Sequence, residues 1–255
     1  PKFIKTKLLS EYTESNLINN KKNNLMNYFQ SVYFTYVNNV VYFQEPNPEI
    51  RIDIQKLCFA GKDGGVQYAK NEEDNGSKKF IEGPKFKPIL EEIDILKKQN
   101  NNKNFLIIQI GSSNGRKIKY LAEKYKEFTL IGIDIFDNVI SYSNDNNRLN
   151  NLSFVKCYAH EIDELISKKK FDICIMFSSG SSQYIQPEHL EIFFKKIRNF
   201  KNIYVMFCEG FYIKNKKNLF LGNPKSFCNF AFHFSHNYDH YANEAGLNVK
   251  KNVNY

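Results

Sequence analysis

The sequence predicts an α/β protein built on a doubly wound, mostly parallel β-sheet, with an accessory region before it. From residue 105 onward, short apolar runs alternate with amphipathic stretches of helical period. The runs are apolar at most positions, which is typical of parallel strands that helices cover on both faces. A turn with two glycines, Gly111 and Gly115, follows the first run. We therefore expect residues 87–255 to form one ligand-binding domain and residues 1–86 the accessory region.

The elements of the expected domain follow one another in a regular order. A first helix at 88–98 begins with a proline and carries apolar residues at helical spacing. Strands are expected at 105–110, 129–135, 152–157, 171–177, 203–208 and 247–253. Further helices are expected at 115–125, 137–147, 161–168, 187–200 and about 236–245. Such connections place the carboxyl ends of the parallel strands at one edge, where ligands bind.

The accessory region has a different pattern. Residues 28–43 are aromatic and rich in β-formers, and residues 50–54 alternate between apolar and polar, as in a half-exposed strand. The segment 61–65 contains three glycines and is expected to be a loop. The polar stretch 70–79 is expected to be a mobile loop.

Length and charge limit the classes of protein that fit. The 255 residues, 42% of them hydrophobic, suffice for one core and an appendage. The formal net charge is +9, but the sequence has four arginines among its 36 basic residues. Base recognition favours arginine. Lys, Asn, Ile, Phe and Tyr, whose codons are rich in A and T, are all abundant, so a genome bias explains the charge. We expect no nucleic-acid partner.

Cysteine usage and hydropathy point to a cytoplasmic protein. The five cysteines are odd in number and far apart, which favours reduced thiols over a disulfide framework or a zinc knuckle. The apolar runs are much shorter than the roughly 20 residues that cross a bilayer. The first residues contain no apolar block of signal-peptide length. We expect no membrane span and no secretion.

The turn after the first strand carries the strongest functional signal. Gly111 and Gly115 allow a tight turn and bring bare backbone close to a ligand at a helix N-terminus. Asp134 ends the second strand, where a carboxylate accepts hydrogen bonds from a ribose diol. A nucleoside-containing cofactor is therefore expected. Arg116 departs from the dinucleotide pattern Gly-x-Gly-x-x-Gly, and no Gly-Lys-Ser/Thr follows, which excludes a P-loop.

These motifs resemble those of the class I S-adenosylmethionine-dependent methyltransferases, which have a Rossmann-like fold. Their first motif, an acid followed by Gly-x-Gly-x-Gly, corresponds to residues 109–115 here, with Gln109 in place of the acid and Ser113 in place of the central glycine. Residues 154–160 resemble the third motif, which lines the adenine, and residues 171–180 resemble the fourth. The resemblance implies S-adenosylmethionine as the cofactor. The residues that it implies for cofactor binding are Gln109, Gly111, Ser113, Gly115, Asp134, Ile135, Ala159, His160 and Ser178.

The acceptor is expected to be a small hydroxylated molecule. The fourth motif lacks the Asn/Asp-Pro-Pro-Tyr/Phe signature of amino methylases, and the sequence lacks the Pro-Cys nucleophile of cytosine C5 methylases. Together with the serines at 178–182, this favours an O-methyltransferase. The sequence is similar to enzymes that methylate capsular or other surface sugars, which implies a nucleotide-activated sugar. Two alternatives stay open, a nucleic-acid-binding or RNA-modifying methyltransferase and an NAD(P)-dependent oxidoreductase.

An oxygen acceptor needs a general base, and the histidine-rich segment 232–240 is the best source of one. His233 and His236 are the candidates, with Asp239 as a group that could orient the imidazole. The alternative interpretation is an exposed helix that carries His236 and is capped by Ser235. Glu209 is a further candidate base.

Metal binding and the role of the accessory region complete the expectations. Metal-dependent O-methyltransferases place a carboxylate after the fourth strand, where this chain has Ser178, so we expect no metal. If the histidines do not supply the base, Tyr184 is another possible source. The accessory region is expected to form a lid over the acceptor pocket or a contact between copies in a homo-oligomer.

Overall fold

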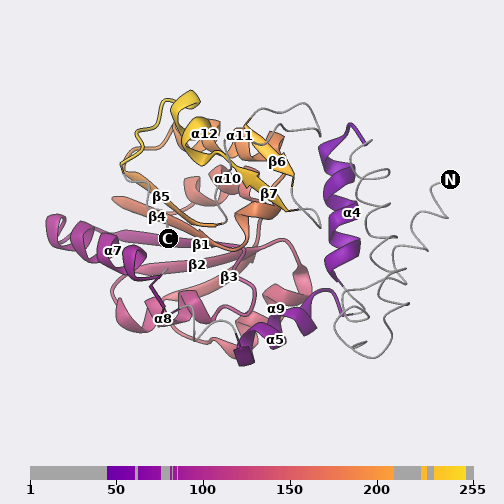
Figure 1. Ribbon diagram of the computed structural model, residues 1–255. Coiled ribbons are helices and arrows are strands. Elements are labelled where there is room, and N and C mark those ends of the chain that lie inside the picture. The colour runs from indigo at the N-terminus through magenta and orange to yellow at the C-terminus, as the bar shows by residue number, and fades with distance from the viewer. Residues whose placement is uncertain are drawn as a thin grey trace.

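The computed structural model describes residues 45–60, 63–75, 81, 83–84, 86–209, 225–228 and 233–250. Five parallel strands form one sheet with helices on both of its faces, which confirms the predicted fold class (Figure 1). The strand order is β3–β2–β1–β4–β5. The strands are β1 (Phe105–Ile110), β2 (Thr129–Asp134), β3 (Leu152–Lys156), β4 (Ile173–Ser179) and β5 (Ile203–Cys208).

The strand order places a crevice at the carboxyl edge. The chain runs outward from β1 to β2 and β3, then returns to place β4 against the other side of β1. In the resulting register, Ile108 of β1 lies between Ile131 of β2 and Met176 of β4. The loops that follow β1 and β4 therefore leave the sheet in opposite directions, and in doubly wound folds this switch point is where ligands bind.

Two apolar layers hold the helices to the sheet. Phe105 and Ile107 of β1 face a layer covered by α7 (Lys87–Gln99) and α8 (Arg116–Lys124). Leu106 and Ile108 face the opposite layer. That layer is covered by α10 (Ile162–Ser167), α11 (Pro187–Ile197) and α12 (Tyr238–Glu244). Because β1 is buried on both faces, its residues are apolar with the exception of Gln109.

The prediction of a strand at 50–54 is wrong, because these residues lie in helix α4 (Pro48–Ala60). Pro48 is the first helical residue, and the side chain of Asn47 accepts a hydrogen bond from the backbone N–H of Glu49 at 2.9 Å. These start signals, together with burial at helical spacing, outweigh the short alternation of apolar residues. The buried residues of α4 are Arg51, Ile52, Ile54 and Gln55.

The prediction of a loop at 70–79 is wrong for its first part, because helix α5 extends over Val66–Asn75. The turn between α4 and α5 includes Gly65, whose φ of 90° lies in the left-handed region. A side chain at Gly65 would also press against Val139 of helix α9 (Asp137–Asn146), which the turn approaches closely. The predicted β-rich segment 28–43 lies outside the described residues.

The histidine-rich segment is also different from the prediction. Residues 226–228 (β6) and 234–236 (β7) form an antiparallel pair, and His236 is therefore in a strand instead of a helix. Helix α12 starts after Asn237, whose side chain accepts a hydrogen bond from the backbone N–H of His240, so Ser235 is not its cap. The predicted strand at 247–253 is absent over residues 247–250, and its remainder lies outside the described residues.

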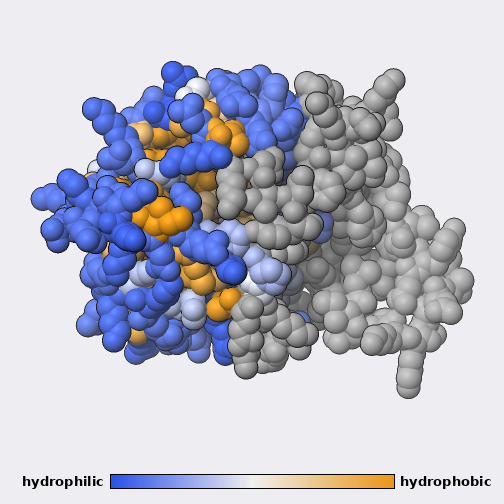
Figure 2. Space-filling view, turned by 60° about the vertical axis from the view of Figure 1, so that its left-hand side comes forward, coloured by the Kyte–Doolittle hydropathy of each residue, from blue (hydrophilic) through white to orange (hydrophobic). Residues whose placement is uncertain are grey.

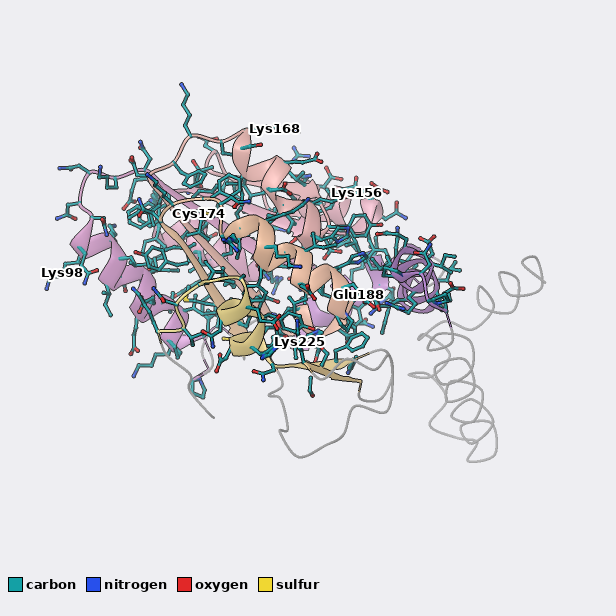
Figure 3. All side chains as sticks on the ribbon, turned by 90° about the horizontal axis from the view of Figure 1, so that it is seen from above. Lys98, Lys156, Lys168, Cys174, Glu188 and Lys225 are labelled. Carbon is teal, nitrogen blue, oxygen red and sulfur yellow. The ribbon has the colours of Figure 1, made fainter. Side chains whose placement is uncertain are left out.

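The surface is consistent with a dispersed basic charge. Figure 2 shows a mainly hydrophilic face on the side of α7, with hydrophobic residues in small groups. Lys98, Lys156 and Lys168 extend outward from separate elements in Figure 3, whereas Cys174 lies in the interior. Several lysines pair with carboxylates; for example, Lys156 lies 2.6 Å from Asp137. Burial raises the pKa of the Cys174 thiol to about 12, as expected for an inert reduced cysteine.

Candidate functional site

The loop between β1 and α8 adopts a special backbone conformation at three alternate positions. Gly111, Ser113 and Gly115 have φ angles of 66°, 46° and 76°. Ser113 is a non-glycine residue in the left-handed region, at an expected cost of about 1–2 kcal/mol. This position corresponds to the central glycine of the first motif. The backbone at position 113 is therefore left-handed, although serine stands where the motif has its central glycine.

Gly111 allows the loop after β4 to approach closely. A side chain at Gly111 would collide with Ser181, whose hydroxyl donates a hydrogen bond to the Gly111 carbonyl at 3.1 Å. This contact joins the two loops that flank the switch point of the sheet. The glycine loop is thus held against the fourth-motif segment.

Asp134 lies at the end of β2 beside the glycine loop. Its Oδ2 accepts a hydrogen bond from the Ser113 N–H at 3.0 Å, and its Oδ1 accepts one from the Ile135 N–H at 2.8 Å. These bonds fix the orientation of the carboxylate. The side chain is half-buried, so it also remains reachable by the hydroxyls of a ligand. A carboxylate fixed in this way suits a ribose diol.

Two further side chains of the loop region have unsatisfied buried atoms. The Oε1 of Gln109 and the Oγ of Ser112 are buried and lack a hydrogen-bond partner among the described residues. A buried polar atom without a partner is costly, so such atoms commonly mark the position of a ligand or a water. Both are near the carboxyl end of β1, and they fit a bound polar ligand there.

The remaining predicted cofactor residues lie at the ends of β3 and β4. Ala159 and His160 are in the short helix η2 (Ala159–Glu161) that follows β3, and the His160 ring stacks on His189 with centroids 3.9 Å apart. Ser178 is buried near the end of β4 and donates a hydrogen bond to Glu209 at 2.6 Å.

Glu209 is a buried carboxylate that directly follows β5. Its Oε1 accepts hydrogen bonds from the Ser178 hydroxyl and from the backbone N–H groups of Ser181 and Ser182 at 3.1 Å. Burial raises the pKa of Glu209, while these hydrogen bonds oppose the increase. The carboxylate therefore holds the loop after β4 in place. Sequence reasoning treated this residue as a fallback base and gave no hint of the serine contacts.

The three predicted catalytic residues have different surroundings. His233 is half-buried and its ring meets Tyr184 edge to face, with centroids 4.5 Å apart. Tyr184 belongs to helix η3 (Ser182–Tyr184), so His233 lies beside the segment that follows β4. His236 is fully buried, and its Nδ1 is 2.7 Å from the Ser226 hydroxyl. Asp239 is in the first turn of α12.

Burial affects the two imidazoles to different extents. It lowers the pKa of His233 below 6.5, so that the ring is neutral at pH 7. It lowers the pKa of His236 to about 3, although hydrogen bonds to the backbone near Ile185 and Ser182 oppose this. His236 is therefore neutral throughout the physiological range and has little affinity for a proton.

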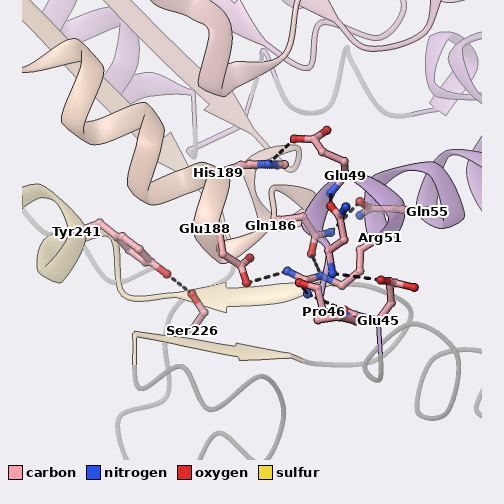
Figure 4. Close-up of polar contacts among 11 residues, drawn as sticks. Glu45, Pro46, Glu49, Arg51, Gln55, Gln186, Glu188, His189, Ser226 and Tyr241 are labelled. Carbon is pink, nitrogen blue, oxygen red and sulfur yellow. Dashed lines mark hydrogen bonds and ion pairs between the residues drawn. The ribbon is translucent and has the colours of Figure 1, made fainter.

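Helix α4 contributes a polar network that the sequence analysis missed (Figure 4). The buried guanidinium of Arg51 donates to the Gln186 side chain at 3.0 Å and pairs with Glu188 at 2.7 Å. Gln55 donates to the Tyr184 carbonyl at 3.0 Å. These contacts join residues about 130 positions apart, and no local pattern predicts them. They fasten α4 to the segment between β4 and α11.

A doubly wound sheet with a glycine loop after β1 and a fixed carboxylate after β2 defines the class of enzymes that bind a nucleoside-containing cofactor. The comparison with known families gives the particular family. A protein-family model described as "Methyltransferase domain" matches residues 101–230, just over half of the chain. The chain therefore belongs to this family. The predicted class, a methyltransferase that uses S-adenosylmethionine, is thereby confirmed.

Solved structures with related folds are distant. A SAM-dependent methyltransferase from Anabaena variabilis is 14% identical, with a TM-score of 0.41 over 55% of this chain and 58% of that chain. The plantazolicin methyltransferase BamL, solved in complex with a triazolic desmethylPZN analogue and SAH, is 22% identical, with a TM-score of 0.40 over 55% of this chain and 49% of that chain. The chain thus spans about half the length of these proteins.

No curated protein matches the chain. Within the residues that the structure describes, helices are too short or too polar to cross a bilayer.

Proposed function

We propose that the chain is an O-methyltransferase that acts on a small hydroxylated acceptor, a nucleotide-activated sugar used for capsule or other surface polysaccharide. The observation that carries the proposal is the meeting of the glycine loop, Asp134 and the serine-rich loop after β4 at one edge of the sheet. The resemblance of the motifs to sugar methyltransferases supports the acceptor class. Two lysines at this edge also support the acceptor class. Lys56 lies beside Tyr158 and Lys117 beside Ser179, and their positive charges suit a diphosphate.

The proposed cofactor residues supply hydrogen bonds of two kinds. Asp134 accepts from the ribose hydroxyls, and the unsatisfied Gln109 Oε1 accepts from an ammonium or amide donor of the ligand. Ile135, Ala159 and His160 line the adenine side. When bound, S-adenosylmethionine supplies an electrophilic methyl group. In-line transfer of that group requires alignment and exclusion of water, to which helices α4 and α5 beside this edge would contribute as a lid.

The position of helices α4 and α5 supports that lid. The side chain of Asn114, in the glycine loop, donates a hydrogen bond to the Ala69 carbonyl of α5 at 3.2 Å. The side chain of Asn138, shortly after Asp134, donates one to the Asp63 carbonyl at 3.1 Å. The turn from α4 to α5 therefore lies next to the proposed cofactor site.

We assign the general base to His233. Its neutral ring lies at the proposed acceptor edge beside Tyr184 and can accept the proton of a sugar hydroxyl. His236, with a pKa of about 3 and a buried partner in Ser226, is given a role in stabilising the β6–β7 pair. Asp239 stays the proposed orienting group.

Substitution of Asp134 tests the cofactor assignment. Asp134→Ala should weaken S-adenosylmethionine binding by about 1.5–3 kcal/mol, because charge-assisted hydrogen bonds are lost. Calorimetry on the folded variant measures the change. Asp137→Ala is the matched control, since that carboxylate is three residues away, mostly exposed and paired with Lys156. Equal affinities for wild type and Asp134→Ala would contradict the ribose assignment.

Methyl transfer to a panel of nucleotide sugars, followed by mass spectrometry, tests the activity and the base together. His233→Ala should reduce kcat by about 10²–10⁴-fold with unchanged cofactor affinity. His240→Ala, which alters a half-exposed imidazole on α12, should keep the wild-type kcat. A wild-type kcat in His233→Ala would shift the assignment to Glu209. Absence of methylated sugar with wild-type enzyme would refute the acceptor class.

A further inference from the structure

Three side chains from distant parts of the chain meet at the end of α4. They are Glu49 in the first turn of α4, His160 in η2 and His189 in α11. Each offers a nitrogen or carboxylate oxygen, and these atoms all lie within 4.8 Å of one another. The Nε2 of His189 is 2.9 Å from the Glu49 carboxylate, and Figure 4 shows these two groups pointing toward each other. The cluster shares His160 with the proposed adenine side of the cofactor site, whereas Glu49 and His189 have no role proposed there.

The hydrogen bonding of His189 is incomplete. The residue is 2% exposed, and its Nδ1 is buried without a hydrogen-bond partner among the described residues. Since Nε2 already contacts Glu49, the ring has a second nitrogen whose bonding capacity is unused. Such an atom in a native interior indicates a water or an ion that completes the site.

Charges around the cluster favour a cation. The neighbouring carboxylates Glu188 and Asp163 are already paired, with Arg51 at 2.7 Å and with Lys196 at 2.8 Å. Glu49 therefore adds a negative charge to two imidazoles.

We propose that Glu49, His160 and His189 bind one divalent transition-metal ion, with Zn²⁺ as the expected occupant. Two imidazoles and one carboxylate are a ligand set that suits Zn²⁺ better than the all-oxygen ions Mg²⁺ and Ca²⁺. Tetrahedral binding needs ligand atoms about 3.4 Å apart, as follows from metal–ligand bonds of about 2.0–2.1 Å. Binding would require the exposed Glu49 side chain to rotate and the His160 ring to turn out of its stack on His189, in which the ring centroids lie 3.9 Å apart.

The ion would fasten the accessory region to the domain. Its ligands come from α4, from the segment after β3 and from the helix after β4. It would therefore act alongside the Arg51 network to hold α4 over the carboxyl edge. The sequence analysis predicted no metal, because ligands at positions 49, 160 and 189 form no recognisable spacing.

Metal titration of the untagged, chelator-treated full chain tests the site. Calorimetry with Zn²⁺ should give one ion per chain, and Co²⁺ should give the visible absorption bands of a four-coordinate site. Glu49→Gln and His160→Gln should weaken binding by tenfold or more. Added Zn²⁺ should slow amide hydrogen exchange in α4 of the wild type and leave α4 of Glu49→Gln unchanged.

Glu244→Gln is the matched control, because Glu244 forms an exposed pair with His240 one helical turn away and should bind no ion of its own. This variant should keep one ion per chain and the wild-type affinity. If His189→Ala does not fold, Glu49→Gln still provides the test, because it changes an exposed side chain. The proposal would be overturned if the wild-type chain bound no stoichiometric Zn²⁺. It would also be overturned if wild type and Glu49→Gln bound Zn²⁺ with equal affinity. Because Glu49 has no role in the proposed cofactor or acceptor site, metal binding by wild type and Glu49→Gln can fail without bearing on the proposed methyl transfer.

Discussion

The two apolar layers beside the sheet and the carboxyl edge of the same sheet are stabilised in different ways. The layers consist of fully buried apolar side chains such as Ile107, Ile175 and Phe177. At the edge, buried polar side chains such as those of Arg51 and Gln186 form hydrogen bonds to specific partners. Apolar contacts are non-directional, whereas each buried polar group needs a partner at a defined distance and angle. The difference implies that the layers carry the stability and the edge carries the geometry of the site.

The largest effect is expected in an apolar layer. Phe177→Ala removes a fully buried ring at the centre of β4 and should lower the free energy of unfolding by about 3–5 kcal/mol. Urea denaturation followed by circular dichroism measures the change. Ile95→Ala, on the exposed side of α7, should cost less than about 1 kcal/mol. Similar losses for the two variants would contradict the distinction between buried and exposed sites.

A smaller and more local effect is expected at the edge. Arg51→Ala should destabilise the docking of α4 by about 2–3 kcal/mol, below the usual cost of breaking a buried ion pair, because Glu188 is partly exposed. Amide exchange in α4 should accelerate by about 30–150-fold while exchange in β1 stays unchanged. Arg148→Ala, which alters an exposed pair with Asp145, is the control. Equal acceleration in β1 would show that the edge and the layers unfold as one unit.

The smallest effect concerns pH. His236 has a folded pKa of about 3, below the ordinary value of about 6.5, so the unfolded chain binds more protons between these values. Its contribution to stability is therefore lost as the pH falls, by about 2 kcal/mol between pH 7.5 and 5. The difference in unfolding free energy between wild type and His236→Gln should shrink by that amount. A difference that is constant with pH would show that the pKa of His236 is the same in the folded and unfolded chain, and would contradict the lowered value.

The same contrast explains what the sequence could predict. The bounds of β1 and β5 were predicted correctly, because each is a short, mainly apolar run with polar residues or a glycine turn on either side. The strand predicted at 50–54 was wrong, because three alternating isoleucines also fit a helix that buries one side. The helix predicted from 236 was wrong at its start, because burial of His236 in a strand pair depends on Ser226, ten residues away.

For the site, the local signals were informative and the distant ones were not. The glycine loop and Asp134 lie side by side as expected, because strand order in a doubly wound sheet dictates it. The roles of the individual residues stay predictions. The contacts of Arg51 with Gln186 and of Glu49 with His189 join segments more than 130 residues apart, and a polar residue in a sequence carries no indication of its partner.

The left-handed φ of Ser113 has a consequence for how such proteins are recognised. The loop needs a sequence of dihedral angles, positive at 111, 113 and 115, and glycine is the cheapest residue that supplies them. A chain can keep the angles and change the residue if the rest of the fold tolerates the strain. A comparison of amino-acid identities penalises the serine at position 113. A comparison of backbone torsion angles would not penalise it, because its φ is positive like those at 111 and 115. Related chains with serine or asparagine at this position are therefore best sought by conformation.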